Sequence, residues 1–399
     1  MKIAILSTLM FDDSIGGVEN HIRFMAREMV SLGHEVMLFK PVWVEKYNSE
    51  LMEVEGIPIT LINAGSRIYN FNRWSGEGFS GLLAGFLEKA QYTLGRKKVV
   101  QTIRHWRPDM VWQHDFSSNW LASRILSRIF PVVLTNHTGE YLFFKKLFAG
   151  KTLLRFLLKH YQAVIGPSKE LTPDFVKFSY TIHNGVDLNF FQPIKPSLKP
   201  DLKERLFGSK EKFVIFCPRR WAPTKGIVFF ARALKWISEN YNRSAEFLIV
   251  FAGSEDPQYP KYVDQINTIL DQQDVSILKL GNLDPYELVS YYQAANLVVI
   301  PSLMEAVSLA ALESMGCGVP VLSSRVGGMP EIIEDGKTGY FVEPGQPIPL
   351  AQAVIKLYES QNQKEVVERS LELVRKKYDW SAVAKVTENI LNEALARSK

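Results

Sequence analysis

Residues 297–315, LVVIPSLMEAVSLAALESM, decide the fold. Their first four residues are apolar and mostly β-branched, which predicts a buried strand, and the residues after Pro301 have the composition of a helix. The same order of strand and helix recurs along the chain, which predicts crossover units and a parallel sheet. Ligands of such sheets bind at the carboxyl ends of the strands. The stretch therefore predicts an α/β fold and a site just after residue 300.

Working outward, short apolar runs separated by amphipathic stretches predict further strands. These runs are 2–6, 36–39, 110–112, 131–135 and 163–165 in the first half, and 213–216, 247–251 and 320–323 in the second. The helix predicted between the first two strands has apolar residues at helical spacing, Ile22, Met25, Ala26, Met29 and Val30, and Gly33 ends it. Residues 347–396 are predicted to be almost wholly helical.

The length of the chain predicts two domains. A chain of 399 residues suits two cores of about 200 residues each. Three prolines in 190–200 indicate a linker, and the strand–helix pattern restarts after it. We therefore expect a Rossmann-like, doubly wound domain over 1–190 and a second over 200–375.

Composition places the protein among ordinary globular chains. It is 46% hydrophobic and 22% charged, and no apolar run reaches the ~18 residues of a membrane span. The strand predicted at 2–6 and the acidic residues at 12–13 argue against a signal peptide. Cys217 and Cys317 lie far apart in the sequence and suggest no disulfide framework. We expect a cytoplasmic protein.

The positive charge is concentrated in the first half. Residues 1–195 hold 23 Lys and Arg against 17 Asp and Glu, a balance of +6 within the total of +5. Such a half could attract phosphate groups or an anionic membrane, or the excess could be ordinary scatter. Residues 141–160 combine five Lys and Arg with many apolar side chains, which suits an interfacial helix on anionic lipid or a crossover helix packed on the sheet. We expect peripheral contact with the inner face of a membrane and no nucleic-acid partner.

Three short segments could carry chemistry. Gly16 and Gly17 precede a predicted helix, where free amides favour an anion. Arg219, Arg220 and Lys225 follow the strand predicted at 213–216 and could clamp a diphosphate. Each of these two segments could also be an ordinary surface loop.

The third segment holds two glutamates, Glu305 and Glu313, eight positions apart. On one helix they would lie about 12 Å apart along the axis, about the length of a sugar–diphosphate–ribose unit. One carboxylate could then take sugar hydroxyls and the other ribose hydroxyls, with helix-start amides between them for phosphate. A helix charge and a surface residue would give the same spacing.

Several motifs together resemble the family 4 glycosyltransferases of the GT-B fold, also called glycosyl transferases group 1. They are GGVENH with GHEV at 16–36, HNGVD at 183–187, RWAPTKG at 220–226 and EAVSLAALESMGCGVPVLSSRVGGMPEIIEDGKTGYFVEP at 305–344. The resemblance implies two Rossmann-like domains facing each other across a cleft that holds the donor. It also implies a final helix, 380–396, that returns to the N-terminal domain, where the acceptor binds.

The resemblance implies a role for individual residues. Arg220 and Lys225 are similar to the pair that binds the donor diphosphate, Glu305 to the carboxylate that faces the donor sugar, and Glu313 to the one that faces ribose. His114 resembles a histidine near the donor sugar. Leu283 belongs to a loop against the nucleotide base. Backbone amides of the α-helix start, at Val307, Ser308 and Leu309, would support the phosphate, beside Gly16 and Gly17.

The expected reaction is a metal-independent, retaining transfer of a hexose from a nucleoside diphosphate sugar to a hydroxyl of a glycan or a lipid-linked acceptor. Cell-surface polysaccharide, lipopolysaccharide or glycolipid synthesis is the expected setting, and no cofactor is expected. The cations and the helix start would stabilise the charge that develops on the leaving diphosphate. A nucleotide-sugar epimerase on the same fold and a non-catalytic sugar-nucleotide-binding protein are the alternatives.

Overall fold

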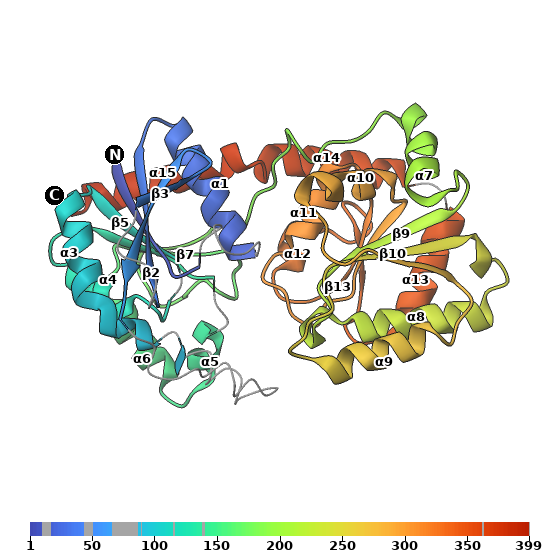
Figure 1. The fold of residues 1–399 in the computed structure, drawn as a ribbon, viewed down its shortest axis with the longest axis horizontal. Helices are drawn as coiled ribbons and strands as arrows, with labels where there is room; N and C mark the ends of the chain where they lie inside the picture. The colour runs from blue at the N-terminus through green and yellow to red at the C-terminus, as the bar shows by residue number, and fades with distance from the viewer. Residues whose placement is uncertain are drawn as a thin grey trace. The chain divides into compact units, whose positions relative to one another are not determined.

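The chain folds into two compact units, each built on one sheet (Figure 1). The computed structural model describes residues 1–9, 17–43, 51–65, 87–88, 90–114, 116–137, 140–360 and 363–398. Unit 1 comprises Met1–Asn184 and Trp380–Lys399, and unit 2 comprises Gly185–Asp379. The proline-rich stretch expected to link two domains thus belongs to unit 2, and a helix begins within it at Lys199.

Unit 1 contains an eight-stranded sheet in the order β3-β4-β2-β1-β5-β6-β7-β8. Its strands are β1 (Lys2–Leu6), β2 (Glu35–Val42), β3 (Leu51–Val54), β4 (Ile57–Asn63), β5 (Met110–His114), β6 (Val132–Thr135), β7 (Ala163–Gly166) and β8 (Ser179–Thr181). Neighbouring strands run parallel, except that β3 pairs antiparallel with β4. The parallel order requires a crossover connection after most strands, which the helices supply.

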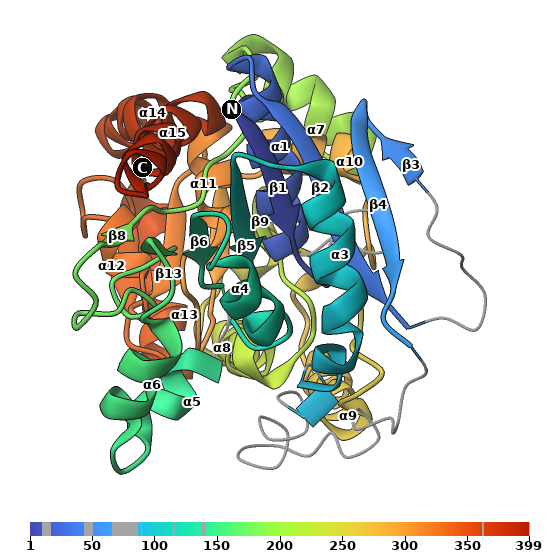
Figure 2. The same ribbon diagram turned by 90° about the vertical axis from the view of Figure 1, so that its left-hand side faces the viewer.

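The helices of unit 1 cover this sheet (Figure 2). They are α1 (Gly17–Ser31), α3 (Arg96–Trp106), α4 (Trp120–Leu126), α5 (Glu140–Lys146), α6 (Gly150–Leu158) and α15 (Trp380–Ala396), with a short 3₁₀ segment at Gln91–Gly95. Of the apolar residues predicted for α1, Val30 is 44% exposed and the others are buried. Gly33, with φ of 85°, takes the left-handed conformation that ends a helix. The last helix, α15, packs against α1 and β6.

Unit 2 contains a six-stranded parallel sheet in the order β11-β10-β9-β12-β13-β14. Its strands are β9 (Phe213–Pro218), β10 (Phe247–Ala252), β11 (Ser276–Lys279), β12 (Leu297–Ile300), β13 (Val321–Ser324) and β14 (Tyr340–Val342). Its helices are α7 (Lys199–Phe207), α8 (Ile227–Asn240), α9 (Pro260–Leu270), α10 (Pro285–Ala294), α11 (Leu309–Gly316), α12 (Met329–Ile332), α13 (Pro347–Ser360) and α14 (Lys364–Lys377), with 3₁₀ turns at Pro196–Leu198, Pro223–Lys225 and Ser244–Glu246.

Both faces of this sheet are buried. Ile215 and Val299 point into one apolar cluster, whereas their neighbours Val214, Phe216 and Val298 point into another. Successive side chains of a strand alternate between faces, so helices must cover both sides. The doubly wound architecture expected from the uninterrupted apolar strands is therefore confirmed.

The predicted strands agree with the observed ones in order and place. β1 and β12 have the predicted bounds, and β13 is shifted by one residue. Five further strands, β3, β4, β8, β11 and β14, were not predicted, and most of them lie at or near a sheet edge. In the part of the chain that the structure describes, no helix is both long enough and apolar enough to cross a bilayer.

Candidate functional site

Four loops meet at the carboxyl ends of β9, β10, β11 and β12 in unit 2. The amide of Gly253, after β10, donates to the carbonyl of Gly281, after β11, at 2.6 Å. The amide of Trp221, after β9, donates to the carbonyl of Ser254 at 2.9 Å. The amide of Leu303, after β12, donates to the carbonyl of Thr224 at 2.9 Å. These bonds tie together the loops in which a parallel sheet places its ligand.

Gly226 allows two of these loops to touch. Its φ is 67°, and a Cβ at this position would lie 2.0 Å from the carbonyl oxygen of Pro301. A side chain would therefore be both strained and blocked. Because Lys225 directly precedes this contact, its ammonium group is carried to the loop that follows β12.

The carboxylate of Glu305 is the centre of the resulting arrangement. Its Oε1 accepts hydrogen bonds from the Arg219 guanidinium, from Lys225 Nζ at 2.8 Å and from Ser302 Oγ at 2.9 Å. The side chain is only 8% exposed, and those of Arg219 and Lys225 are 10% and 23% exposed. None of these bonds uses Oε2, which leaves that oxygen for a ligand.

Arg219 also reaches the start of α11. Its Nη1 donates to Ser308 Oγ at 3.0 Å, while Nη2 donates to Glu305. One guanidinium fork thus fixes the carboxylate relative to the helix start, as only a planar group with several donors can. Arg219 was one of the three cations predicted to clamp a diphosphate, but its bonds to Glu305 and Ser308 were not predicted.

Arg220, which the resemblance selected, faces elsewhere. Its side chain is 60% exposed and its Nε lies 3.5 Å from Asp256 Oδ2. Neighbouring residues of an extended chain point in opposite directions, so only one of two adjacent arginines can face Glu305. Burial and the positive charges of Arg219 and Arg220 lower the pKa of Lys225 to about 6.

Glu305 and Glu313 do not lie on one helix. Because α11 begins at Leu309, Glu305 belongs to the preceding loop, and the axial spacing expected from a continuous helix is wrong. Glu313 lies in the middle of α11, and its Oε2 accepts a hydrogen bond from the Tyr292 hydroxyl at 2.7 Å. Burial raises the pKa of the Glu313 carboxyl, against the opposing effects of Tyr292 and Arg219.

A carboxylate exposed in a ligand site would contribute little to stability, but Glu305 is not exposed. Its charge is nearly buried and paired. Removing one partner of a buried ion pair strongly destabilises a protein, because the other charge is left buried and unpaired.

The remaining predicted donor-site residues of unit 2 fall near the same loops. Val307 and Ser308 are buried and Leu309 is the first residue of α11. The first-turn amides of such a helix have no acceptor within it, which suits an anion. Leu283 packs partly buried beside the second apolar cluster, before α10. In unit 1, Gly17 is the first residue of α1, and Gly16 lies outside the described residues.

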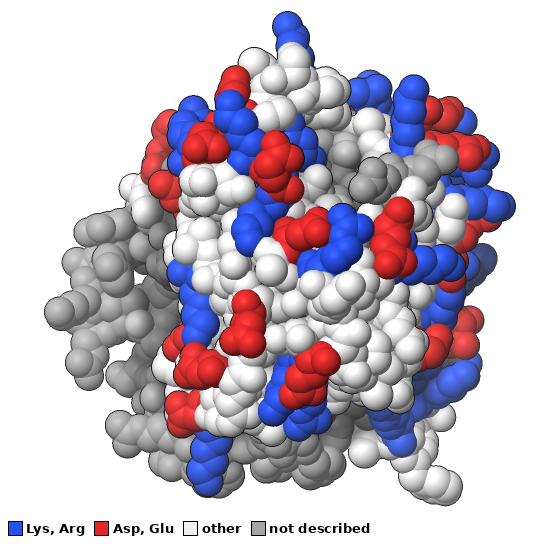
Figure 3. Space-filling model, turned by 90° about the vertical axis from the view of Figure 1, so that its right-hand side faces the viewer, with Lys and Arg blue, Asp and Glu red and all other residues white. Residues whose placement is uncertain are grey.

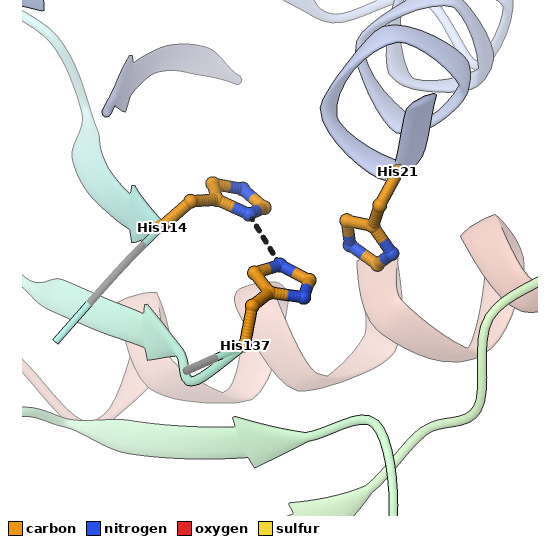
Figure 4. Close-up of side chains that lie close together, drawn as sticks. All are labelled: His21, His114 and His137. Atoms are coloured by element: carbon orange, nitrogen blue, oxygen red, sulfur yellow. Dashed lines mark hydrogen bonds between the residues drawn. The ribbon is translucent and has the colours of Figure 1, made fainter. Parts of the chain in front are cut away.

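His114 ends β5 in unit 1 and belongs to a group of three histidines (Figure 4). Its Nδ1 lies 3.1 Å from Nε2 of His137, and the ring of His21 lies opposite both. Burial lowers the pKa of His114 and of His137 well below the ordinary value and that of His21 to about 4, so the three rings are neutral at pH 7. We refer to His21, His114 and His137 as the histidine cluster. The sequence analysis named only His114, because the three positions are distant in sequence.

Comparison with known proteins identifies the family. Residues 15–190 match the model for Glycosyltransferase Family 4, and residues 199–372 match the model for Glycosyl transferases group 1. The two matches leave only the ends and a short central segment uncovered. The chain is a family 4 glycosyltransferase of group 1.

Relatives of this glycosyltransferase include an uncharacterized glycosyltransferase of Methanocaldococcus jannaschii, 26% identical over 99% of both chains. A second is the UDP-Gal:alpha-D-GlcNAc-diphosphoundecaprenol alpha-1,3-galactosyltransferase of Escherichia coli, 29% identical over 59% of this chain and 62% of the relative. Among solved structures, sucrose-phosphate synthase of Thermosynechococcus elongatus aligns over 99% of both chains with a TM-score of 0.80 and 19% identity. Anabaena HepE in complex with UDP and glucose aligns over 98% of this chain and 99% of its own, with a TM-score of 0.72 and 20% identity.

These likenesses confirm the GT-B-type fold, and family membership confirms the expected class of enzyme, a glycosyltransferase that uses a nucleotide sugar. The epimerase and the non-catalytic binding protein were the weaker alternatives, since neither is the activity for which this family is named.

Proposed function

We propose that this glycosyltransferase moves a hexose, with retention of configuration, from a nucleoside diphosphate sugar to a hydroxyl of a lipid-linked or anionic glycan acceptor. The observation that carries the donor half is the Glu305 carboxylate, held by three donors on one oxygen beside the start of α11. A fixed carboxylate next to free helix amides provides an acceptor for sugar hydroxyls and donors for a diphosphate.

In this proposal Arg219 is a positioning residue. It is nearly buried and already bonded to both Glu305 and Ser308, so it holds the carboxylate in place. Arg220 is exposed, and Lys225 is partly exposed, so these two cations and the first-turn amides of α11 can bind the diphosphate. Charge that develops on the leaving oxygens is then stabilised by groups already in place.

Glu313 would bind the ribose. The Tyr292 hydroxyl occupies Oε2 of Glu313, which orients the carboxylate and leaves Oε1 for a ribose hydroxyl. Ribose contacts change little as the glycosidic bond breaks, whereas contacts at the transferred sugar lie beside the developing charge.

Steady-state kinetics on two variants test these roles, with the donor first chosen by thermal shift from a panel of nucleotide sugars. A donor present at a hundred times its Kd stabilises the native state by about 2.7 kcal/mol. Glu305→Ala should lower kcat by about 10²-fold or more, the scale of one lost transition-state contact. Glu313→Ala should raise KM more than it lowers kcat. Equal, small effects from both variants would show that the two roles are wrong, and an isomerised donor without acceptor would indicate an epimerase.

The acceptor half of the proposal rests on a hairpin in unit 1, formed by α5, the turn 147–149 and α6. Four large apolar side chains are exposed on it: Leu147 (40%), Phe148 (104%), Leu153 (41%) and Phe156 (48%). Residues 141–160 contain five Lys and Arg and no Asp or Glu. By contrast, the face drawn in Figure 3 carries positive and negative side chains interspersed.

The expected single interfacial helix is thus a pair of helices, because the chain turns before Gly150. α6 buries Leu154 and Leu158 and exposes Leu153 and Phe156 beside basic residues. This pattern suits insertion of the apolar side chains at an anionic lipid surface. The Escherichia coli relative, whose name specifies a diphosphoundecaprenol-linked acceptor, supports an acceptor of this kind.

Vesicle flotation tests the membrane contact. The protein should bind anionic vesicles at low salt, bind less at high salt because screening weakens the attraction, and ignore zwitterionic vesicles. Phe148→Asp should abolish binding, and Tyr286→Asp, at an aromatic residue of unit 2 that is 73% exposed, should not. Binding that Phe148→Asp leaves unchanged would refute the role of the hairpin.

A further inference from the structure

The histidine cluster joins three separate elements of unit 1 (Figure 4). His21 comes from the first turns of α1, His114 ends β5, and His137 follows β6. One ligand atom from each ring can be chosen such that all three lie within 4.8 Å of one another. Unlike the donor site of unit 2, this cluster contains no carboxylate.

The spacing of the rings matches that of imidazoles around one cation. Zinc–nitrogen distances of about 2.0–2.1 Å in a tetrahedral site place two ligand nitrogens about 3.3 Å apart and two ring centres about 5 Å apart. Here His114 Nδ1 and His137 Nε2 lie 3.1 Å apart. The three ring centres lie 4.5, 5.4 and 5.5 Å apart. The three rings could therefore bind one cation after only small movements of their side chains.

A ring nitrogen of the cluster lacks a partner among the described residues. His21 Nε2 is buried and neither accepts nor donates a hydrogen bond there. A buried polar atom without a partner costs free energy, so a ligand that supplies one is favoured. The ring nitrogen of an imidazole that carries no proton has a lone pair, which can bind a metal ion.

Asn184 fixes the orientation of one ring. Its Oδ1 lies 3.0 Å from His21 Nδ1 and accepts that proton, so the lone pair of His21 is on Nε2, the unpartnered atom. Hydrogen bonds of this kind hold metal-binding histidines in the correct tautomer. Asn184 belongs to the HNGVD segment at 183–187, for which the donor site provides no use.

We propose that His21, His114 and His137 bind one zinc-class divalent cation, with Asn184 orienting His21. Imidazole suits Zn²⁺, Co²⁺ and Ni²⁺, whereas Mg²⁺ and Ca²⁺ require oxygen ligands. Sugar transfer does not require this cation. If His114 faces the sugar, as the family resemblance implies, a bound cation occupies the same ring, and the cation inhibits transfer. Only this inhibition depends on the proposed function; binding itself does not.

Calorimetry on the full chain after chelator treatment tests the site, with ZnCl₂ as titrant and MgCl₂ as control. We expect one Zn²⁺ per chain and no heat from Mg²⁺. His21→Gln and His137→Gln should each weaken Zn²⁺ binding by at least about 100-fold, and Asn184→Ala by about 10- to 100-fold. His105→Gln, an exposed histidine of α3, should bind as the unaltered protein does.

X-ray absorption of the zinc-loaded, unaltered protein provides a readout that no folding defect can obscure. The expected spectrum has imidazole back-scattering from three rings with nitrogens at about 2.0–2.1 Å. A chain that binds no Zn²⁺ would overturn the proposal. So would stoichiometric binding that survives His21→Gln and His137→Gln, or a spectrum dominated by oxygen ligands.

Discussion

Replacing Glu305 by alanine should destabilise unit 2 as well as slow the reaction. Among the described residues, the substitution removes the only carboxylate that the Arg219 guanidinium bonds, and the Arg219 side chain is 10% exposed. Lys225 can release its proton, because its pKa is already lowered, but a guanidinium cannot. Removing one partner of a buried ion pair costs about 3–5 kcal/mol, much of it from the charge left behind.

Native-state hydrogen exchange measures this loss in unit 2 alone. Amides of β9 and β12 sit in the centre of its sheet and exchange through opening of the unit. A loss of about 3 kcal/mol should speed their exchange by more than about 100-fold. Unfolding of the whole chain is less suitable, because proteins of two domains need not unfold in one step.

Two further variants separate this cause from others. Glu343→Ala removes a carboxylate that is 71% exposed and 3.5 Å from Arg325, and it should cost at most about 1 kcal/mol. Arg219→Met in the Glu305→Ala background should restore part of the loss, because it removes the uncompensated charge. If Glu305→Ala changes exchange no more than Glu343→Ala, the carboxylate does not compensate a buried charge and the reasoning fails.

Three more outcomes follow from the same loops. Burial raises the pKa of the Glu313 carboxyl in the folded state, so its contribution to stability is complete below the pKa of the unfolded state and is lost as pH rises through the folded pKa. Glu313→Gln should therefore raise the Tm at pH 8 and not at pH 4. A Tm at pH 8 equal to that of the unaltered protein would contradict this. Because the pKa of Lys225 is lowered to about 6, binding of the anionic UDP at pH 7.5 should be accompanied by uptake of a fraction of a proton. The binding heat should then depend on the buffer, and Lys225→Met should remove this dependence. The same heat in all buffers would exclude proton uptake by Lys225. Gly226→Ala should weaken UDP binding by 10-fold or more, since a Cβ there meets the Pro301 carbonyl, and an unchanged Kd would show that the loops can separate freely.

Local sequence was sufficient for the architecture because the strands are buried on both faces. β1 and β12 are uninterrupted apolar runs bounded by polar or turn residues, and such runs have few other interpretations. The edge strands β11 and β14 are short and half exposed, so their composition resembles that of loops. These segments are strands because they pair with neighbouring strands, and their own sequence does not predict this.

The site was predictable in its loops and not in its contacts. The motif at 305–344 located Glu305, but the sequence did not show which of the adjacent Arg219 and Arg220 bonds that carboxylate. The direction in which each arginine side chain points depends on where the extended conformation of β9 ends, and the sequence composition does not reveal that position. The histidine cluster is harder still, because His21 and His137 meet only through the order of β1, β5 and β6 in the sheet.

The way in which unit 2 begins and ends has a consequence for biosynthesis. Val186 and Asp379 form a parallel bridge, and the Val186 amide donates to the Tyr378 carbonyl at 2.7 Å. The chain therefore enters and leaves unit 2 at the same place. A ribosome therefore delivers all of unit 2 before it delivers α15, whose buried face includes Trp380, Val383 and Ile390 of unit 1. We expect the nascent chain to complete its second unit first and to expose the apolar docking surface of α1 until α15 has emerged from the ribosome.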